Sequence, residues 1–571
     1  LSQERSYFKA FGHVRVTRPG GVTLDCGRLH YDGFEQVLHL RERVVAHEPG
    51  RTLRCDSLDY NTESKEAHYF GGRGTLVAGP NTIVADEGTY NTESKHFLFT
   101  GNVVMRSAQG RIRAANTPRA EGNMETGDIH VTGKSTISMS DGSVIHTNEG
   151  TFNQITGSAQ TTGHATITSP ERDIEGSDIH FNNETGDAEG HNGVTIKDKK
   201  ERRDIKGKDL WYNSRTGYME GRGDVDIVDH KNDRTIRGQR VVYNAQSGEM
   251  ENYGNALVDD RAAQRVIKGD TLIYNEKTRM GEGHGNVDYT DHKNKNAFRA
   301  QDCFYTEEAA LAYGGNPGPL ALDFSQGDTL YVHADTVRMR AWNVNTDSVY
   351  RKVYGVDNVR AYRTDVQAVA GLLVASTRDS CVTLYDDPVL WNGSRQVTGD
   401  SIRAFMNDST IREAYVMGQA MSIERMPDEK HYNQISAAVL HAHFIDGVAR
   451  QATAINSVRA VYYPVDDKDS TLTGMVYVET DTMRMFLSPE RKLQKIWMPK
   501  TEGTMYPMNQ IPPEQERLRG FVWLENLRPR DKDDVFRRVT KAGSLRRQYR
   551  KVALPPRQRI INDFRDSGLQ R

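Results

Sequence analysis

The chain has 571 residues, of which 36% are hydrophobic and 27% are charged, and its 75 lysines and arginines nearly balance 77 aspartates and glutamates. This balance argues against a nucleic-acid partner, since proteins that bind the phosphate backbone carry a clear excess of basic residues. A globular chain of this length is expected to split into several domains, and the low hydrophobic content favours a thin array with much exposed surface.

A sequence pattern that recurs about every 30 residues occupies the first half of the chain. It reads apolar, any, small, any, any, apolar, any, aromatic, and it usually ends in Tyr-Asn. Weaker copies begin at Leu24, Leu53, Ile83 and Phe298, and clear copies begin at Ile174, Ile205, Ile236 and Ile267. The constant spacing of the clear copies indicates a stacked array in which each repeat contacts its neighbours.

Each repeat has a second half, in which a glycine precedes alternating apolar residues, as in residues 223–227 and 254–258. Both halves alternate with a period of two, which indicates strands with one buried face, and we take the glycine as the start of its strand. Between the halves, stretches such as residues 213–217 predict a tight turn. The asparagine side chain forms a hydrogen bond with the backbone two residues further along, and glycine adopts the left-handed conformation that closes the loop. Each repeat is therefore predicted to be a β-hairpin.

Within the first half, the alternation slips by one residue after the small position. The slip predicts a bulge at which the strand bends from one sheet into a second, which gives a V-shaped, two-sheet β solenoid. Only a small side chain fits such a crease, and Cys26 and Cys55 hold this position in successive repeats. Equivalent positions lie two strands apart, roughly 10 Å, which is too far for a disulfide.

We predict three segments along the chain. Residues 1–313 form the regular hairpin array, and a stretch rich in glycine and proline then interrupts it. Residues 320–500 resume the pattern with longer spacing, as a looser jelly-roll-like segment. Residues 501–571 form a proline-containing tail with 16 Lys/Arg against 9 Asp/Glu. The tail is either solvated or in contact with an anionic surface or partner. Within it, residues 518–524 are an apolar anchor expected to dock on the array, and residues 533–549 are a candidate short helix.

No arrangement of residues typical of a catalytic or metal site stands out. Residues 127–135 resemble a P-loop but have one residue too many between the glycines. His431, His441 and His443 cluster without a cysteine or carboxylate at ligand spacing. We therefore expect no enzyme activity, no metal and no cofactor. The longest apolar stretch is too short to cross a bilayer. A first residue other than Met suits a processed secreted protein, although a trimmed chain looks the same.

The inward side chains of the repeats are predicted to form one continuous apolar stripe. It has either of two roles: an ordinary solenoid core, or the lining of a partly open groove for acyl chains, whose aromatic residues keep a polar tip near a wet edge. The candidate lining residues are Val14, Val16, Leu29, Tyr31, Leu58, Tyr60, Val103, Met105, Ile179, Phe181, Leu210, Tyr212, Val241, Tyr243, Leu272 and Tyr274.

Two recurrent motifs resemble the OstA-like family: Gly-Asn-Val (residues 101–103 and 285–287, with the variant Gly-Asn-Ala at 254–256) and Gly-x-x-apolar-x-Tyr-Asn (residues 207–213, 238–244 and 269–275). These are the lipopolysaccharide-transport bridge proteins also called LptA. The resemblance covers residues 10–310 well and 320–500 loosely.

The resemblance implies an elongated, all-β antiparallel jelly-roll, or β-taco, that is periplasmic or associated with the outer membrane. Its interior would shelter the acyl chains of lipid A. The implied partners are lipopolysaccharide and other transport components at the inner or outer membrane, with no nucleic acid.

Two alternatives to a lipid bridge come from other classes of protein. A closed structural or interaction scaffold that binds no lipid has the same repeats, so the sequence leaves it open. A carbohydrate-active parallel β-helix is disfavoured, because asparagine-led hairpin turns imply antiparallel strands and no carboxylate cluster appears on one face.

Overall fold

The computed structural model of the chain describes residues 7–182, 184–325, 327–407, 410–466, 471–490 and 493–538. The chain forms two compact units, Leu1–Ala262 and Ala263–Arg571. In the described residues the regular structure is strand, apart from three short 3₁₀ helices, and neighbouring strands within each unit run antiparallel. The predicted all-β class with antiparallel hairpins is therefore confirmed.

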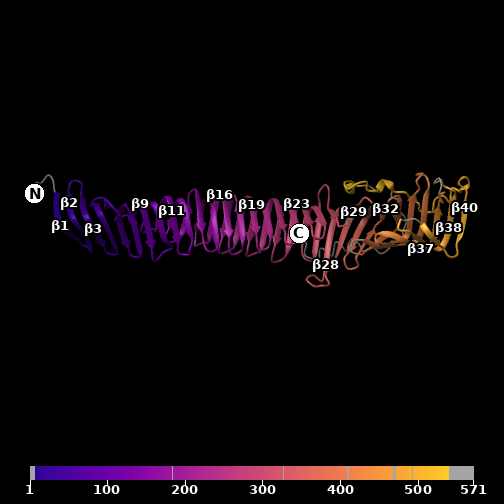
Figure 1. Ribbon diagram of the computed structural model, residues 1–571, viewed down its shortest axis with the longest axis horizontal. Helices are drawn as coiled ribbons and strands as arrows, with labels where there is room; N and C mark the ends of the chain where they lie inside the picture. The colour runs from indigo at the N-terminus through magenta and orange to yellow at the C-terminus, as the bar shows by residue number, and fades with distance from the viewer. Residues whose placement is uncertain are drawn as a thin grey trace. The chain divides into compact units, whose positions relative to one another are not determined.

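In the first unit, the strands follow one another in chain order and lie side by side (Figure 1). Its strands are β1 (Tyr7–Arg18), β2 (Val22–Asp32), β3 (Val37–Glu48), β4 (Arg51–Asn61), β5 (Glu66–Phe70), β6 (Gly74–Ala78), β7 (Asn81–Ala85), β8 (Glu87–Asn91), β9 (His96–Ser107), β10 (Ile112–Asn123), β11 (Asp128–Met139), β12 (Val144–Asn153), β13 (Ser158–Thr161), β14 (His164–Thr168), β15 (Arg172–Asn182), β16 (Asp187–Asp198), β17 (Arg203–Gly207), β18 (Asp209–Asn213), β19 (Tyr218–Asp229), β20 (Arg234–Asn244) and β21 (Glu249–Asp260). Pairs of short strands take the place of one long strand, since β16 pairs with both β17 and β18.

The second unit repeats this plan with more variable lengths. Its elements are β22 (Arg265–Asn275), β23 (Met280–Asp291), β24 (Asn296–Tyr305), β25 (Ala309–Tyr313), β26 (Leu320–Asp323), β27 (Leu330–His333), β28 (Thr336–Trp342), β29 (Tyr350–Tyr362), β30 (Val366–Ser376), β31 (Cys381–Tyr385), β32 (Val389–Asn392), β33 (Arg395–Thr398), β34 (Ser401–Asn407), β35 (Thr410–Arg425), β36 (Tyr432–Ile445), β37 (Val448–Tyr462), β38 (Met475–Leu487), β39 (Leu493–Trp497), β40 (Glu502–Tyr506), and the 3₁₀ helices η1 (Met508–Gln510), η2 (Glu525–Leu527) and η3 (Asp534–Phe536).

A crease crosses the long strands near their middles. The pairing of β19 with β20 shifts register between Arg222 and Val225, and the pairing of β2 with β3 shifts between Asp25 and Arg28. The crease divides the sheet into two arms. The first arm contains the strand halves that correspond to β17, and the second arm contains those that correspond to β18. The predicted bulge is confirmed, and because β16 runs through the crease with partners on both sides, the two arms remain one hydrogen-bonded sheet.

The small-residue position of the crease is also confirmed. Cys26 and Cys55 are 7% and 8% exposed, and both are free thiols. A Cβ atom added at Gly238 would lie 1.9 Å from the side-chain oxygen of Asn252, and one added at Gly207 would lie 3.0 Å from Leu210. Burial raises the pKa of the Cys55 thiol to about 12, so it is protonated at neutral pH and its role is packing.

The glycine of the second half lies at the crease and not at the start of a strand, so that prediction was wrong. Strand β19 begins at Tyr218 and continues through Gly223 and Asp224, whose φ angles are 74° and 50°. Two successive left-handed residues form the bulge. Glycine adopts this conformation without steric cost, and aspartate or asparagine tolerates it better than other residues. A glycine followed by alternating apolar residues marks a crease and a strand start equally well.

The predicted asparagine turns are confirmed. The Asn213 side-chain oxygen accepts hydrogen bonds from the backbone N–H groups of Arg215 and Thr216, at 3.0 and 2.9 Å, and Gly217 has a φ of 69°. At the turn after β4, Lys65 takes the same left-handed position with a φ of 61°. These turns hold the outer end of the second arm in register.

The C-terminal segment 507–538, here called the strap, lies along the second unit (Figure 1), where side chains of β29 and β33 donate hydrogen bonds to it. Gln396 and Gln434 hold it, and both are at most 1% exposed. They point away from the inward residues Val397 and Ile435, so the strap covers the outer face of the first arm. Leu518 packs into the apolar cluster beneath the strap and is 5% exposed, so the predicted anchor docks.

The predicted helix at residues 533–549 is not present in its described part. Only Asp534–Phe536 forms a 3₁₀ turn, and Arg537 is already extended. Residues 539–549 lie outside the described residues. Among the described residues, no helix has the length and hydropathy needed to span a membrane.

Candidate functional site

The predicted lining residues fall into two classes by burial. Those next to the crease are at most 5% exposed: Leu29, Leu58, Val103, Ile179, Leu210, Val241 and Leu272. Those nearer the turns are half-buried: Tyr31, Tyr60, Met105, Phe181, Tyr212, Tyr243 and Tyr274. Val14 and Val16 are half-buried and pack on the core of the first unit. We call the buried residues next to the crease the floor, and the half-buried, mostly aromatic end nearer the turns the mouth.

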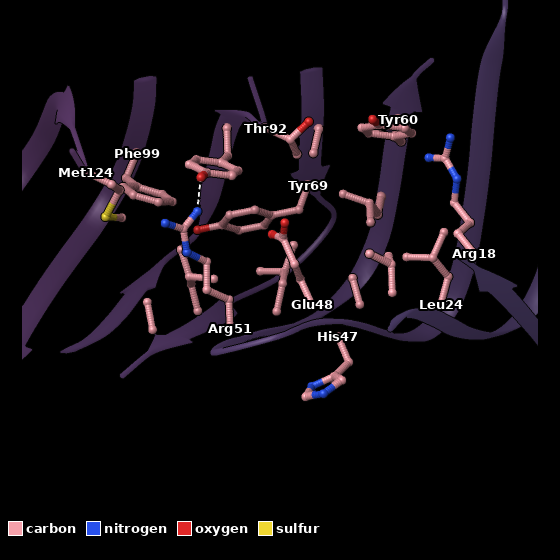
Figure 2. A pocket seen from close by; sticks show the side chains of 18 residues that line it. Arg18, Leu24, His47, Glu48, Arg51, Tyr60, Tyr69, Thr92, Phe99 and Met124 are labelled. Carbon is pink, nitrogen blue, oxygen red and sulfur yellow. Dashed lines mark hydrogen bonds between the residues drawn. The ribbon is translucent and has the colours of Figure 1, made fainter. Parts of the chain in front are cut away.

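A cavity of about 190 Å³ lies between the two arms of the first unit, and Figure 2 shows it from close by. It is lined by Arg18, Val22, Leu24, Ala46, His47, Glu48, Arg51, Leu53, Leu58, Tyr60, Ala67, Tyr69, Leu76, Ala78, Tyr90, Thr92, Phe99 and Met124. Of the predicted lining residues, only Leu58 and Tyr60 are among them. The volume is below the ~300–1,000 Å³ typical of sites for drug-sized ligands, so a larger ligand requires the arms to part.

The Tyr69 ring crosses the cavity and is positioned by two glycines. A Cβ atom at Gly74 would lie 2.3 Å from the ring, and one at Gly88 would lie 2.5 Å from it and from the Phe99 ring. The side chain is 4% exposed, and its hydroxyl lies 3.4 Å from the Ala85 carbonyl oxygen. Burial raises the pKa of Tyr69 above its usual range, so the phenol is neutral. Gly74 and Gly88 therefore leave the space that lets an aromatic ring form the wall.

Arginines of the first arm reach across the mouth to tyrosines of the second arm. The Arg51 guanidinium donates to the Tyr90 hydroxyl, the bond marked by the dashed line at Arg51 in Figure 2, and lies 5.4 Å from the ring centre. Arg18 lies 5.9 Å from the centre of the Tyr60 ring. Such contacts between a cation and an aromatic face are attractive by about 0.5–2 kcal/mol. They hold the two arms together above an apolar floor.

Later repeats keep the arginine but pair it with an aspartate. Arg172 donates to the Tyr212 hydroxyl at 2.8 Å and to Asp198 at 3.2 Å. Ion pairs at the equivalent positions join Arg203 to Asp229 at 3.5 Å, Arg234 to Asp260 at 3.0 Å and, in the second unit, Arg265 to Asp291 at 3.0 Å. The charge of the mouth is therefore neutralised in these repeats.

Asp291 provides a test of this neutralisation by pH. Burial raises the pKa of its carboxyl, but hydrogen bonds from Asn294 and Arg265 outweigh this effect and lower the pKa to about 2. Because the folded pKa lies below the usual value of about 3.9, the group stabilises the fold above that value, and the contribution is lost as pH falls toward 2. We expect Arg265→Gln to raise this pKa, as measured by NMR titration of labelled aspartate. An unchanged pKa would contradict the ion pair.

The mouth arginines were absent from the sequence-based prediction of the lining. The signal was present, since arginine stands two residues before the first apolar residue at positions 51, 172, 203, 234 and 265. Tyr90 closes a weak copy of the repeat, and Tyr69 has no equivalent in the pattern. The mouth arginines contact tyrosines about 40 positions further along the chain, and a search within one repeat does not reveal such contacts.

Within the described residues, no group of three or more histidine, cysteine, aspartate or glutamate side chains is arranged to hold a metal ion. The polar groups at the cavity are arginines, tyrosines, Glu48 and Thr92. His47 points away from it in Figure 2. The arrangement suits binding of an amphipathic molecule.

Two family profiles match the chain. The profile described as OstA-like protein matches residues 1–115, and the profile described as LptA/(LptD N-terminal domain) LPS transport protein matches residues 82–187. No curated protein matches the chain.

Two solved structures show weak likeness. LptH of Pseudomonas aeruginosa, the LptA homologous periplasmic component of the lipopolysaccharide transport device, is 10% identical, with 25% of this chain and 95% of that one covered and a TM-score of 0.19. The WD40 domain of SCAP from fission yeast is 10% identical, with 80% and 95% covered and a TM-score of 0.10. At these TM-scores neither likeness carries an argument. The two profile matches together span residues 1–187, and this part of the chain is OstA/LptA-like.

Proposed function

We propose that the chain is a non-enzymatic, periplasmic lipid carrier that shelters the acyl chains of lipid A and helps to move lipopolysaccharide to the outer membrane. The profile matches support the coarser role in lipopolysaccharide transport. The finer proposal depends on one observation, the apolar cavity between the arms with arginine and tyrosine at its mouth. An apolar floor below a polar mouth fits a ligand with hydrocarbon chains and a polar head.

The partners we propose are lipopolysaccharide and other components of its transport at the inner or outer membrane. Strand β1 supports such a contact. Within the described residues it pairs only with β2, so its other edge carries open backbone groups. Tyr7, Phe8 and Phe11 on this strand are 65%, 53% and 72% exposed. An edge strand with exposed apolar side chains is suited to pairing with a strand of another protein.

A closed scaffold that binds no lipid is the second candidate, and the contacts across the mouth favour it. Arg51 and Tyr90 bridge the arms, as do Arg172 and Tyr212, and the cavity is small. The two functions differ in one property, namely whether the arms part to admit a hydrocarbon chain.

Photo-crosslinking to lipopolysaccharide separates the two functions. We expect a photoreactive phenylalanine at Tyr60 to label lipopolysaccharide, because this ring lines the cavity. The matched control is Phe70, an aromatic residue one position beyond the inward Tyr69 and therefore on the opposite face, where the Arg41 guanidinium lies 4.9 Å from its ring centre. Leu210 and its outward neighbour Trp211, which donates to Glu189 at 3.0 Å, form a second pair. Equal labelling of both faces, or none at either, would leave the closed scaffold.

A further inference from the structure

The mouth of the cavity carries two guanidinium groups, those of Arg18 and Arg51. The contacts of Arg18 and Arg51 across the mouth are with tyrosines, Tyr60 and Tyr90. Among the described residues, neither arginine forms an ion pair. This arrangement differs from the later repeats, where the arginines at the position of Arg51 are paired with aspartate. The position of Arg18, at the end of a strand, is held there by an aspartate such as Asp198 or Asp229.

The unpaired arginines and the cavity occur together. Arg18 and Arg51 are both lining residues of the 190 Å³ cavity (Figure 2). One carboxylate, Glu48, also lines it and is half-buried, so the mouth carries two positive charges and one negative charge. A net positive mouth above an apolar floor presents both halves of a site for an anionic amphiphile, with the charges placed where its head would emerge.

We propose that Arg18 and Arg51 bind the phosphate group of an amphipathic lipid whose hydrocarbon chain enters the cavity. The proposal rests on the function proposed above and adds the chemical group that this end of the groove recognises. Guanidinium offers planar pairs of N–H donors that match phosphate oxygens, and such charge-assisted bonds are about twice as strong as neutral ones. On binding, the Arg51 group exchanges its neutral tyrosine acceptor for an anionic one, which favours opening of the mouth.

The test measures binding of fluorescent lipid A to the full chain, with and without its phosphate groups. We expect Arg18→Gln/Arg51→Gln to weaken binding of the phosphorylated lipid by about tenfold for each arginine. Binding of the dephosphorylated lipid should stay unchanged. Added salt should weaken only the phosphorylated lipid's binding to the wild type. Glu48→Gln should strengthen binding of the phosphorylated lipid, because it removes a negative charge that repels the phosphate.

The matched control is Arg15→Gln/Arg54→Gln, which removes the same two charges from the outer face of the same two strands and should leave binding unchanged. The Arg15 ion pair with Asp25 that it breaks is exposed and contributes little. Arg18→Lys/Arg51→Lys keeps the charge and should restore part of the affinity. A lysine variant as weak as the glutamine variant would assign the loss to packing of the mouth and overturn the proposal.

Inorganic phosphate distinguishes a lipid headgroup from a free anion. We expect it to bind far more weakly than phosphorylated lipid, because it gains nothing from the apolar floor. Equal binding of the two would make the mouth a site for a free anion and overturn the lipid assignment. If the wild type binds neither form of the lipid, the proposed function fails. If it binds both forms equally and the arginine variants change nothing, only the phosphate site fails.

Discussion

Replacing Val241 with aspartate is expected to open the middle of the first unit while leaving its beginning folded. Val241 is fully buried in a cluster with Val194, Leu210 and Val225. A carboxylate there has no partner within the apolar floor. An unpaired buried charge costs about 3–5 kcal/mol, and the carboxyl relieves part of this cost by staying protonated or by local opening. Either outcome lowers the stability of strands β18 to β20 and their neighbours.

Hydrogen exchange measures how far this damage spreads. In a repeat array, each unit is coupled mainly to its neighbours. We therefore expect faster exchange between residues 203 and 260 and unchanged exchange in β2 to β4, whose side chains belong to a separate cluster. Lys206→Asp, at an exposed position on β17, is the control and should change neither region. Uniform loss of protection throughout the first unit would contradict this one-dimensional coupling.

The repeat, the crease and the turns were predictable because each depends on residues close together in the sequence. The period of two marked the buried face, and the slip after Gly207 and Gly238 marked the bulge. Asn213 and Gly217 carry the turn geometry in their own chemistry. The same local reasoning misplaced Gly223, because the left-handed conformation that it supplies is needed equally at a crease and at a turn.

The candidate groove was predictable in part. Strand alternation placed Leu58 and Tyr60 on the inward face, and both line the cavity. Whether the full predicted stripe contacts lipid stays a prediction. The mouth depends on pairing across the V, and only the folded arms bring Arg51 to Tyr90. Whether a mouth arginine is neutralised likewise depends on an aspartate on a neighbouring strand, such as Asp198 for Arg172.

Only one partner in the contact between the strap and the sheet was predictable. The apolar residues 518–524 indicated an anchor, but the residues that receive it are glutamines, which are usually exposed. Gln434 donates to the Glu516 carbonyl oxygen at 2.9 Å and accepts from the Leu518 N–H at 2.8 Å. Gln396 does the same with Val522 and Leu524, both at 2.7 Å. Each side-chain amide thus replaces the backbone of a neighbouring strand, a role that composition does not reveal.

Replacing both glutamines with alanine is expected to release the middle of the strap. The change leaves four backbone groups of the strap without partners, and each buried group left unpaired costs about 1–3 kcal/mol. Lifting the segment into water avoids that cost, so the strap is expected to detach while the sheet beneath it stays folded. Arg517 and Arg519 flank the buried Leu518, so trypsin reports the opening directly. We expect cleavage there to accelerate by about 10–100-fold, since each 1.4 kcal/mol changes the open population tenfold.

The control for this experiment is Gln510→Ala, which removes an exposed glutamine from the strap itself and should leave cleavage unchanged. Detachment also uncovers Met421, Ile423 and Met475 on the outer face, which are at most 4% exposed when the strap is in place. Binding of a hydrophobic dye should therefore increase together with cleavage, because a newly exposed apolar patch is the direct consequence of lifting Leu518. Faster cleavage without dye binding would mean that the strap frays near Arg517 while its apolar anchor stays docked. Unchanged cleavage in the double variant would show that Leu518 and Trp523 hold the strap by burial alone, and that the glutamine pairs fix only its register.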